Sequence, residues 1–148
     1  MYAPASTRKW LVDEADHQRL AKAAALIFSS EPEVIAVYLY GSAARREPAA
    51  DLDLAVLADA PIHPRRLEAL AGKLQGEGAP GGPEIDLRQL WQAAPRFQIE
   101  VLKHARLLFE RNRGLRLERE ALVMSRWADF KPTWERMRRL MLDRWRRG

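Results

Sequence analysis

Residues 34–42 are Val-Ile-Ala-Val-Tyr-Leu-Tyr-Gly-Ser, and residues 51–57 are Asp-Leu-Asp-Leu-Ala-Val-Leu. The first stretch is apolar and rich in β-branched and aromatic side chains, which predicts a buried strand over 34–40. It leads into a Gly-Ser turn and a short helical stretch over 42–46. The second stretch predicts another strand, which opens with two carboxylates. Because alternate side chains of a strand point to the same face, Asp51 and Asp53 are expected to lie side by side.

Two adjacent ionised carboxylates repel each other unless a cation lies between them. Asp51 and Asp53 therefore predict a site for Mg²⁺, which prefers oxygen ligands. Gly41 permits a tight turn and a close approach of the backbone to phosphate. Ser42 offers a hydroxyl and a backbone N–H to phosphate oxygens, and Arg45 offers positive charge. A phosphate-binding turn beside a metal-binding carboxylate pair indicates phosphoryl or nucleotidyl transfer.

A third carboxylate follows on the predicted strand over 84–90, in which polar and apolar residues alternate. If this strand lies beside residues 51–57, Asp86 joins the same face. There it would bind metal or accept a proton from an attacking hydroxyl. Glu84, two residues earlier on that face, is the rival for this role. A polar face on an edge strand would give the same pattern without any catalytic function.

The remaining pattern alternates helices and strands. Apolar periodicity predicts helices over 13–29, 65–75 and 95–105, a strand over 106–110, a Gly- and Pro-rich loop over 76–83, and two tail helices separated near Pro132. We therefore expect a small α/β (α+β) domain, with a mixed sheet flanked by helices, over residues 1–112. A C-terminal helical tail is expected over 113–148, where it would dock a partner.

Composition narrows the class of protein. The chain has no cysteine, which excludes disulfide scaffolds, thiolate nucleophiles and thiolate zinc sites. It shows neither a cleavable signal pattern nor an apolar run near the ~20 residues of a membrane span, so a soluble cytoplasmic protein is expected. The net charge is +5, and residues 111–148 contain twelve Lys or Arg against five Asp or Glu. The tail is thus either a surface that binds an acidic partner, such as nucleic acid or an acidic protein, or a solvated helical face.

The motif residues Gly41, Ser42, Asp51, Asp53 and Asp86 resemble the signature of the polymerase-beta-like nucleotidyltransferase superfamily. Within it, the layout is similar to the minimal nucleotidyltransferase (MNT) domains. Residues 99–112 resemble the helix and strand that follow the third carboxylate in MNT antitoxins, and residues 120–132 resemble their terminal helices. Two positions depart from the family pattern: Arg46 stands where glycine is common, and Ala50 where serine is frequent.

The resemblance implies a polymerase-beta-like fold and the antitoxin of a type VII-like HEPN/MNT pair. Such an antitoxin would transfer AMP from ATP onto a tyrosine hydroxyl of its partner, a HEPN-type RNase toxin. By the same resemblance, Asp51, Asp53 and Asp86 are the catalytic and Mg²⁺-binding residues, and Gly41, Ser42 and Arg45 bind the nucleotide. The basic, Trp-rich tail would then dock the toxin in a hetero-oligomer.

Three alternatives remain open from the sequence. A catalytically silent antitoxin could neutralise the toxin by binding alone, although it would not need clustered carboxylates. Transfer to a small hydroxylated molecule would require an acceptor pocket, usually from a larger second domain. A nucleic-acid binder could use the basic tail, and its binding would weaken steeply with salt; direct nucleic-acid binding is the less favoured interpretation.

Overall fold

The computed structural model describes residues 8–148. Its elements are, in chain order, α1 (Glu14–Phe28), β1 (Val34–Tyr40), α2 (Gly41–Ala44), β2 (Asp51–Ala58), α3 (Pro64–Gly78), β3 (Glu84–Gln89), α4 (Pro95–His104), β4 (Arg106–Glu110) and α5 (Arg113–Arg147). The predicted strands and the helices before residue 106 are all present, with bounds shifted by a few residues.

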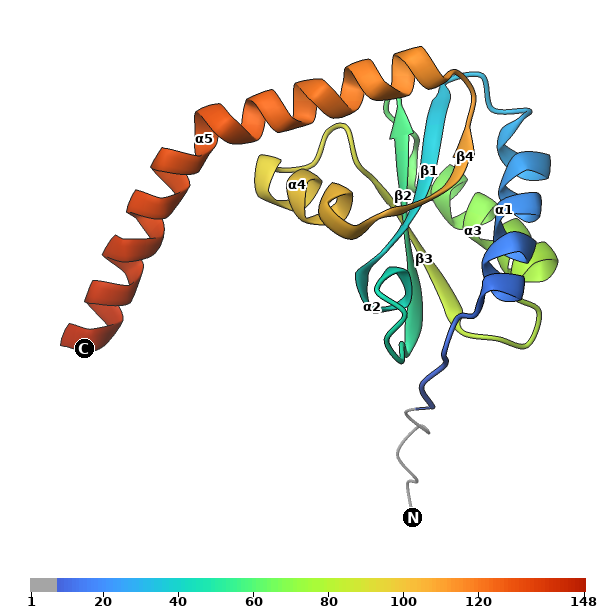
Figure 1. Cartoon of the computed structure of the whole chain (residues 1–148), viewed down its shortest axis with the longest axis horizontal. Helices are drawn as coiled ribbons and strands as arrows, with labels where there is room; N and C mark the ends of the chain where they lie inside the picture. Colours follow the sequence, from blue (N-terminus) through green and yellow to red (C-terminus); the bar gives the residue numbers. More distant parts are fainter. Residues whose placement is uncertain (1–7) are drawn as a thin grey trace.

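The four strands form one mixed sheet in the order β3-β2-β1-β4. β1 pairs antiparallel with both β2 and β4, whereas β2 and β3 run parallel. Parallel neighbours need a crossover connection, which α3 provides. The predicted small mixed sheet flanked by helices is thus confirmed (Figure 1).

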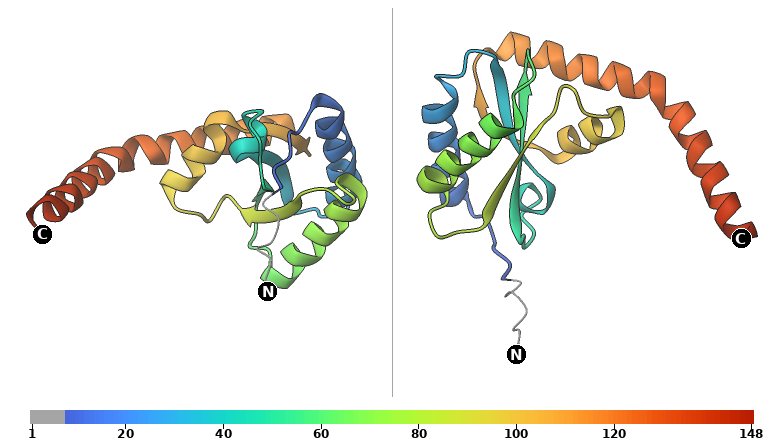
Figure 2. Two further views of the ribbon diagram at one scale, coloured as in Figure 1. Left: turned by 90° about the horizontal axis from the view of Figure 1, so that it is seen from below. Right: turned by 180° about the vertical axis from the view of Figure 1, so that it is seen from behind.

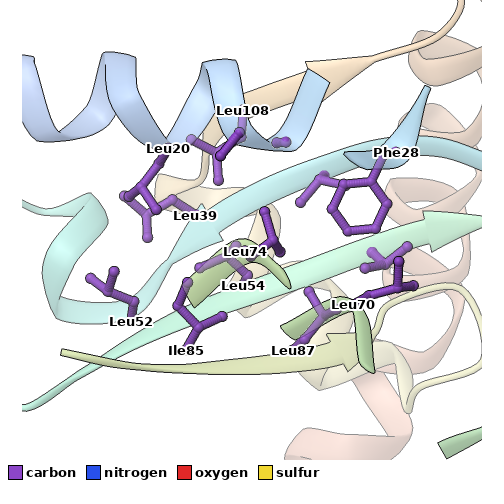
Figure 3. Packing of buried hydrophobic residues seen from close by; sticks show 14 of the residues in the cluster. Leu20, Phe28, Leu39, Leu52, Leu54, Leu70, Leu74, Ile85, Leu87 and Leu108 are labelled. Carbon is purple, nitrogen blue, oxygen red and sulfur yellow. The ribbon is translucent and has the colours of Figure 1, made fainter. Parts of the chain in front are cut away.

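Helices cover both faces of the sheet. On one face, α1 and α3 pack over a core that includes Leu52 and Leu54 of β2 (Figure 3). On the other face, α4 packs over a smaller cluster that includes Ala55 and Leu57. Because side chains alternate along β2, Asp53 shares the face of Ala55 and Leu57. The carboxylates therefore point to the α4 side of the sheet, opposite the larger core.

The prediction of a loop over 76–83 is wrong for its first three residues, because α3 continues to Gly78. A Cβ atom at Gly78 would lie 3.1 Å from Leu20 Cδ2 and 3.2 Å from Ala23 Cβ. The missing side chain allows α3 to approach α1 closely here. Tertiary packing thus extends the helix through glycines that would disfavour it in isolation.

The prediction of two tail helices is also wrong: α5 is one helix of 35 residues that contains Pro132. The ribbon bends where its colour passes from orange to red (Figure 1). Proline lacks the N–H that would bond to the carbonyl four residues earlier, which explains a bend at this position. The helix nevertheless continues on both sides of it.

The first half of α5 is fixed to the sheet domain. Val123 is buried, and the Tyr38 hydroxyl donates a hydrogen bond to Glu120 Oε1 at 2.7 Å. Arg116 lies within 2.8 Å of Glu120 and pairs with Glu110 of β4. Beyond the bend, the distal part of α5 extends past α4 (Figures 1 and 2). None of the helices described over residues 8–148 has the length and apolar character needed to cross a membrane.

Candidate active site

The predicted carboxylates meet where β2 and β3 run side by side. In the parallel register, Asp53 is paired with Asp86, and Asp51 is paired with Glu84. Residues paired across neighbouring strands share a face, so all four acidic side chains belong to the α4 side of the sheet. Asp53 and Asp86 are half-buried, whereas Asp51 and Glu84 are exposed. Asp86 is therefore the neighbour of Asp53, and its rival Glu84 is the neighbour of Asp51.

The Gly-Ser turn lies against the second carboxylate. Gly41 has a φ of +71°, in the left-handed region that favours glycine. A Cβ atom at this position would lie only 2.8 Å from Asp53 Oδ2. Both the backbone angle and the contact therefore require glycine, and they bring Ser42, the next residue, to the same edge of the site.

Burial and negative neighbours perturb the central carboxylate. The pKa of Asp53 is raised, mainly because burial disfavours the charged form and also because Asp86 and Asp51 lie nearby. A bound divalent cation would remove this repulsion. In the described residues 8–148, no three acidic or histidine side chains form a complete metal site. Mg²⁺ is usually held by one or two carboxylates together with substrate phosphates and water, so the Asp51–Asp53 pair fits it.

Arg88 is a further charged residue of this face that sequence reasoning missed. Its Nε lies 3.1 Å from Asp86 Oδ2. The nearby side chain of Tyr40, followed by Asp86, raises the pKa of Arg88. Burial, together with the negative charge of Asp53, raises the pKa of Tyr40 to about 12. Arg88 follows Asp86 by two residues on one strand, and this i, i+2 spacing could have identified it.

A cavity of about 300 Å³ opens beside the first two carboxylates. Its lining residues are Lys9, Ser42, Pro48, Ala49, Ala50, Asp51 and Asp53. Lys9 reaches this place because the neighbouring Trp10 forms a β-bridge with Ala49, in which each backbone N–H donates to the other carbonyl, at 2.7 and 2.8 Å. Sequence reasoning missed Lys9, since nothing in its local pattern predicts a partner about forty residues later in the chain.

The two arginines that follow the Gly-Ser turn have other neighbours. Arg45 lies 3.4 Å from Glu47 and is not one of the described residues that line the cavity. Arg46 lies 3.8 Å from Glu14 and has a φ of +59°, which is strained for any residue except glycine. The left-handed backbone explains why a glycine would be favoured at position 46.

The comparisons with known proteins agree with this geometry. The family model for polymerase beta nucleotidyltransferases matches residues 22–114, which is more than half of the chain. No curated protein sequence matches the chain significantly.

Among solved structures, one chain of a Shewanella oneidensis complex between a tri-AMPylated HEPN toxin and an MNT antitoxin is 19% identical, with a TM-score of 0.68. The match covers 85% of this chain and 98% of that one. A toxin–antitoxin structure with AMP-PNP is 18% identical, has a TM-score of 0.69 and covers 82% of this chain and 98% of that one.

A third structure is a mutant MntA toxin–antitoxin complex in which two aspartates, two positions apart, are replaced by glutamate. It is 17% identical, with a TM-score of 0.70, and covers 82% of this chain and 98% of that one. At these identities the structural matches establish the fold, and the predicted polymerase-beta-like fold is confirmed. The family match covers the turn, all three carboxylates and the sheet that holds them. The chain belongs to the polymerase beta nucleotidyltransferase family.

Proposed function

We propose that this protein is the antitoxin of a HEPN/MNT pair, and that it transfers AMP from ATP onto a tyrosine hydroxyl of its HEPN-type toxin. The observation that carries the proposal is the register of the site: Asp51 and Asp53 share a face, Asp86 is paired with Asp53, and the Gly41–Ser42 turn contacts that same carboxylate. The family supplies the reaction class, namely nucleotidyl transfer.

Three solved structures support the identity of the acceptor and the donor. They are a tri-AMPylated HEPN toxin with an MNT antitoxin, a toxin–antitoxin with AMP-PNP, and a complex altered at two aspartates two positions apart. The last spacing equals that of Asp51 and Asp53. A chain of the same fold and family, with the same spacing of carboxylates, fits the same chemistry.

In the reaction, the tyrosine oxygen attacks the α-phosphorus of ATP. An O–P bond forms, the bond between the α-phosphorus and the bridging oxygen breaks, and pyrophosphate leaves with that electron pair. Asp86 accepts the proton of the tyrosine hydroxyl, and the guanidinium of Arg88, 3.1 Å away, orients the Asp86 carboxylate. Ser42 donates to a phosphate oxygen and helps to align the nucleotide.

Asp51 and Asp53 would hold Mg²⁺, which neutralises negative charge on the phosphates in the transition state. Burial and the neighbouring carboxylates raise the pKa of Asp53, and a cation held at the pair would offset the repulsion between them. By the family resemblance we also assign Gly41, Ser42 and Arg45 to nucleotide binding. Arg45 is exposed and would have to leave Glu47 to reach the phosphates.

The distal part of α5 is proposed as the surface that docks the toxin. Trp134, Met137, Arg138, Met141, Leu142 and Trp145 line a groove of about 370 Å³ on it. Met141 is 62% exposed and Trp145 is 83% exposed, which is unusual for such large apolar side chains. On this assignment, residues 1–112 form the catalytic domain and residues 113–148 the docking tail. A cytoplasmic location stays a prediction.

The deciding experiment incubates the protein with the product of the neighbouring reading frame, ATP and Mg²⁺, and measures the intact mass of that product. We expect one or more increments of AMP. The D51N/D53N double variant is the matched control and should give none while still binding the toxin. A stable complex without any mass increase would contradict the proposal and favour the second candidate, an antitoxin that acts by binding alone.

The exposed tail favours that second candidate by a specific observation, because a large apolar surface is what a purely steric inhibitor needs. A M141E/W145E variant of the full chain separates the two roles. If the tail only docks the toxin, the variant should lose toxin binding and keep ATP binding. Loss of neutralisation in this variant but not in D51N/D53N would show that binding is sufficient.

A further inference from the structure

We propose that Lys9 binds the terminal phosphates of the nucleotide and stabilises the pyrophosphate as it leaves. This inference rests on the proposed function and adds to it a residue outside the family motif, since the family model begins at residue 22. The juxtaposition that carries it is the cavity of about 300 Å³ in which Lys9 faces Ser42, Asp51 and Asp53.

Backbone pairing holds Lys9 at this cavity. The next residue, Trp10, forms both hydrogen bonds of a β-bridge with Ala49, two residues before Asp51. Arg8 precedes Lys9, and its guanidinium lies 4.3 Å from the centre of the Trp10 ring. The two residues that flank Lys9 are therefore in contact with each other. The segment around Lys9 is therefore attached to the same loop that leads into the catalytic strand.

The charges of the cavity fit one kind of ligand. Two carboxylates repel a bare phosphate, and an ammonium group repels a bare metal ion. A metal–triphosphate complex satisfies both, because the metal faces Asp51 and Asp53 while phosphate oxygens face the lysine and the Ser42 hydroxyl. A lysine ammonium has three N–H donors and no acceptor, which suits phosphate oxygens.

The position of Asp86 indicates which phosphates lie next to Lys9. The attacked α-phosphate must lie within reach of Asp86, which accepts the proton of the acceptor. Asp86 does not line this cavity, whereas Lys9 does. The lining includes Ser42, which follows β1, whereas Asp86 belongs to β3 on the other side of β2. The β- and γ-phosphates would therefore lie on the β1 side of the carboxylate pair, beside Lys9. Lys9 would neutralise the charge that develops there.

The test compares the dissociation constants of ATP and AMP, in the presence of Mg²⁺, for the wild-type protein and the K9Q variant. We expect K9Q to weaken ATP binding about tenfold, as for loss of one charge-assisted contact, and to change AMP binding by less than about twofold. K9R should restore most of the ATP affinity. K73Q, at an exposed lysine of α3 on the opposite face, is the matched control and should leave both constants unchanged.

Unchanged ATP affinity in K9Q would overturn the inference, and so would an equal loss for ATP and AMP, because Lys9 would then act on the fold of the site. The outcome is separable from the proposed function. If the wild-type protein binds ATP but never modifies the toxin, the proposed function fails while the comparison of K9Q with K73Q still decides the role of Lys9. If the wild-type protein does not bind ATP, both are overturned.

Discussion

Gly41 and Asp53 are in such close contact that a Cβ atom on residue 41 would lie 2.8 Å from Asp53 Oδ2. A methyl group here displaces the carboxylate that we propose as a metal ligand, and the φ of +71° adds backbone strain. We expect G41A to lower AMP transfer at least a hundredfold and to destabilise the fold by about 1–3 kcal/mol. Transfer assays and thermal unfolding of the same preparation measure the two effects. Wild-type activity in G41A would show that the turn and the carboxylate are not in contact during catalysis.

Asp53 is a place where stability and activity oppose each other. Its raised pKa reflects a buried negative charge beside two others, so D53N should stabilise the metal-free protein by roughly 1–3 °C in unfolding temperature while abolishing transfer. Mg²⁺ should raise the unfolding temperature of the wild type and not that of D53N. D143N, at an exposed residue of α5, is the control. A lower unfolding temperature for metal-free D53N would contradict this account.

The same carboxylate makes the stability of the metal-free protein depend on pH. Because the pKa of Asp53 lies above its ordinary value of 3.8, the folded state binds this proton more tightly than the unfolded chain does. The contribution of Asp53 to stability is therefore greatest below pH 3.8 and is lost as the pH rises through the raised pKa. Denaturant titrations of wild type and D53N across this window should converge at low pH. Parallel curves would exclude Asp53 as the source.

Arg46 offers a stabilising substitution outside the catalytic residues. Its φ of +59° costs energy for arginine and none for glycine, and its exposed contact with Glu14 at 3.8 Å contributes little. We expect R46G to stabilise the protein by about 0.5–1 kcal/mol. The neighbouring R45G is the matched control. Because Arg45 has an ordinary φ of −82°, this variant should lower the free energy of unfolding by about 0.5–1 kcal/mol. Denaturant unfolding distinguishes the two, and equal losses would rule out strain at position 46.

Glu120 connects α5 to the sheet, since it accepts hydrogen bonds from both Tyr38 and Arg116. Its removal leaves the partly buried Tyr38 hydroxyl without its acceptor and leaves Arg116 with Glu110 alone, so E120A should cost about 1–3 kcal/mol of folding stability. E118A, at an exposed position of the same helix, should stay within about 0.5 kcal/mol of the wild type. Chemical unfolding monitored by tryptophan fluorescence measures both. Similar values for the two variants would show that α5 is not anchored through Glu120.

The parts predicted correctly from sequence are those determined by local pattern. The apolar run before Gly41 and the alternation around Asp53 specify two strands. Because Asp51 and Asp53 open the second strand, the pattern also specifies that the two carboxylates lie at its start. The pairing of Asp86 with Asp53 was conditional on the order of the strands, which the register then confirmed. The roles assigned to these residues stay predictions until activity is measured.

The parts that sequence reasoning missed depend on contacts between distant segments. Lys9 joins the site only through the bridge between Trp10 and Ala49. α3 passes the predicted loop boundary because Gly78 lets it approach Leu20. α5 continues through Pro132, which local propensity interprets as a break. The first two depend on a partner that no short window of sequence contains.

The bend of α5 sets the direction in which the far end of the tail can reach. With about 1.5 Å of rise per residue, its 35 residues give a contour length of about 50 Å. A straight helix would continue in the direction of its first half, whereas the bend turns the distal part of α5 past the outer side of α4 (Figures 1 and 2). The carboxylates also point to the α4 side. The angle of the bend near Pro132 therefore determines how a protein bound to the distal part of α5 would be oriented relative to the face that carries the carboxylates.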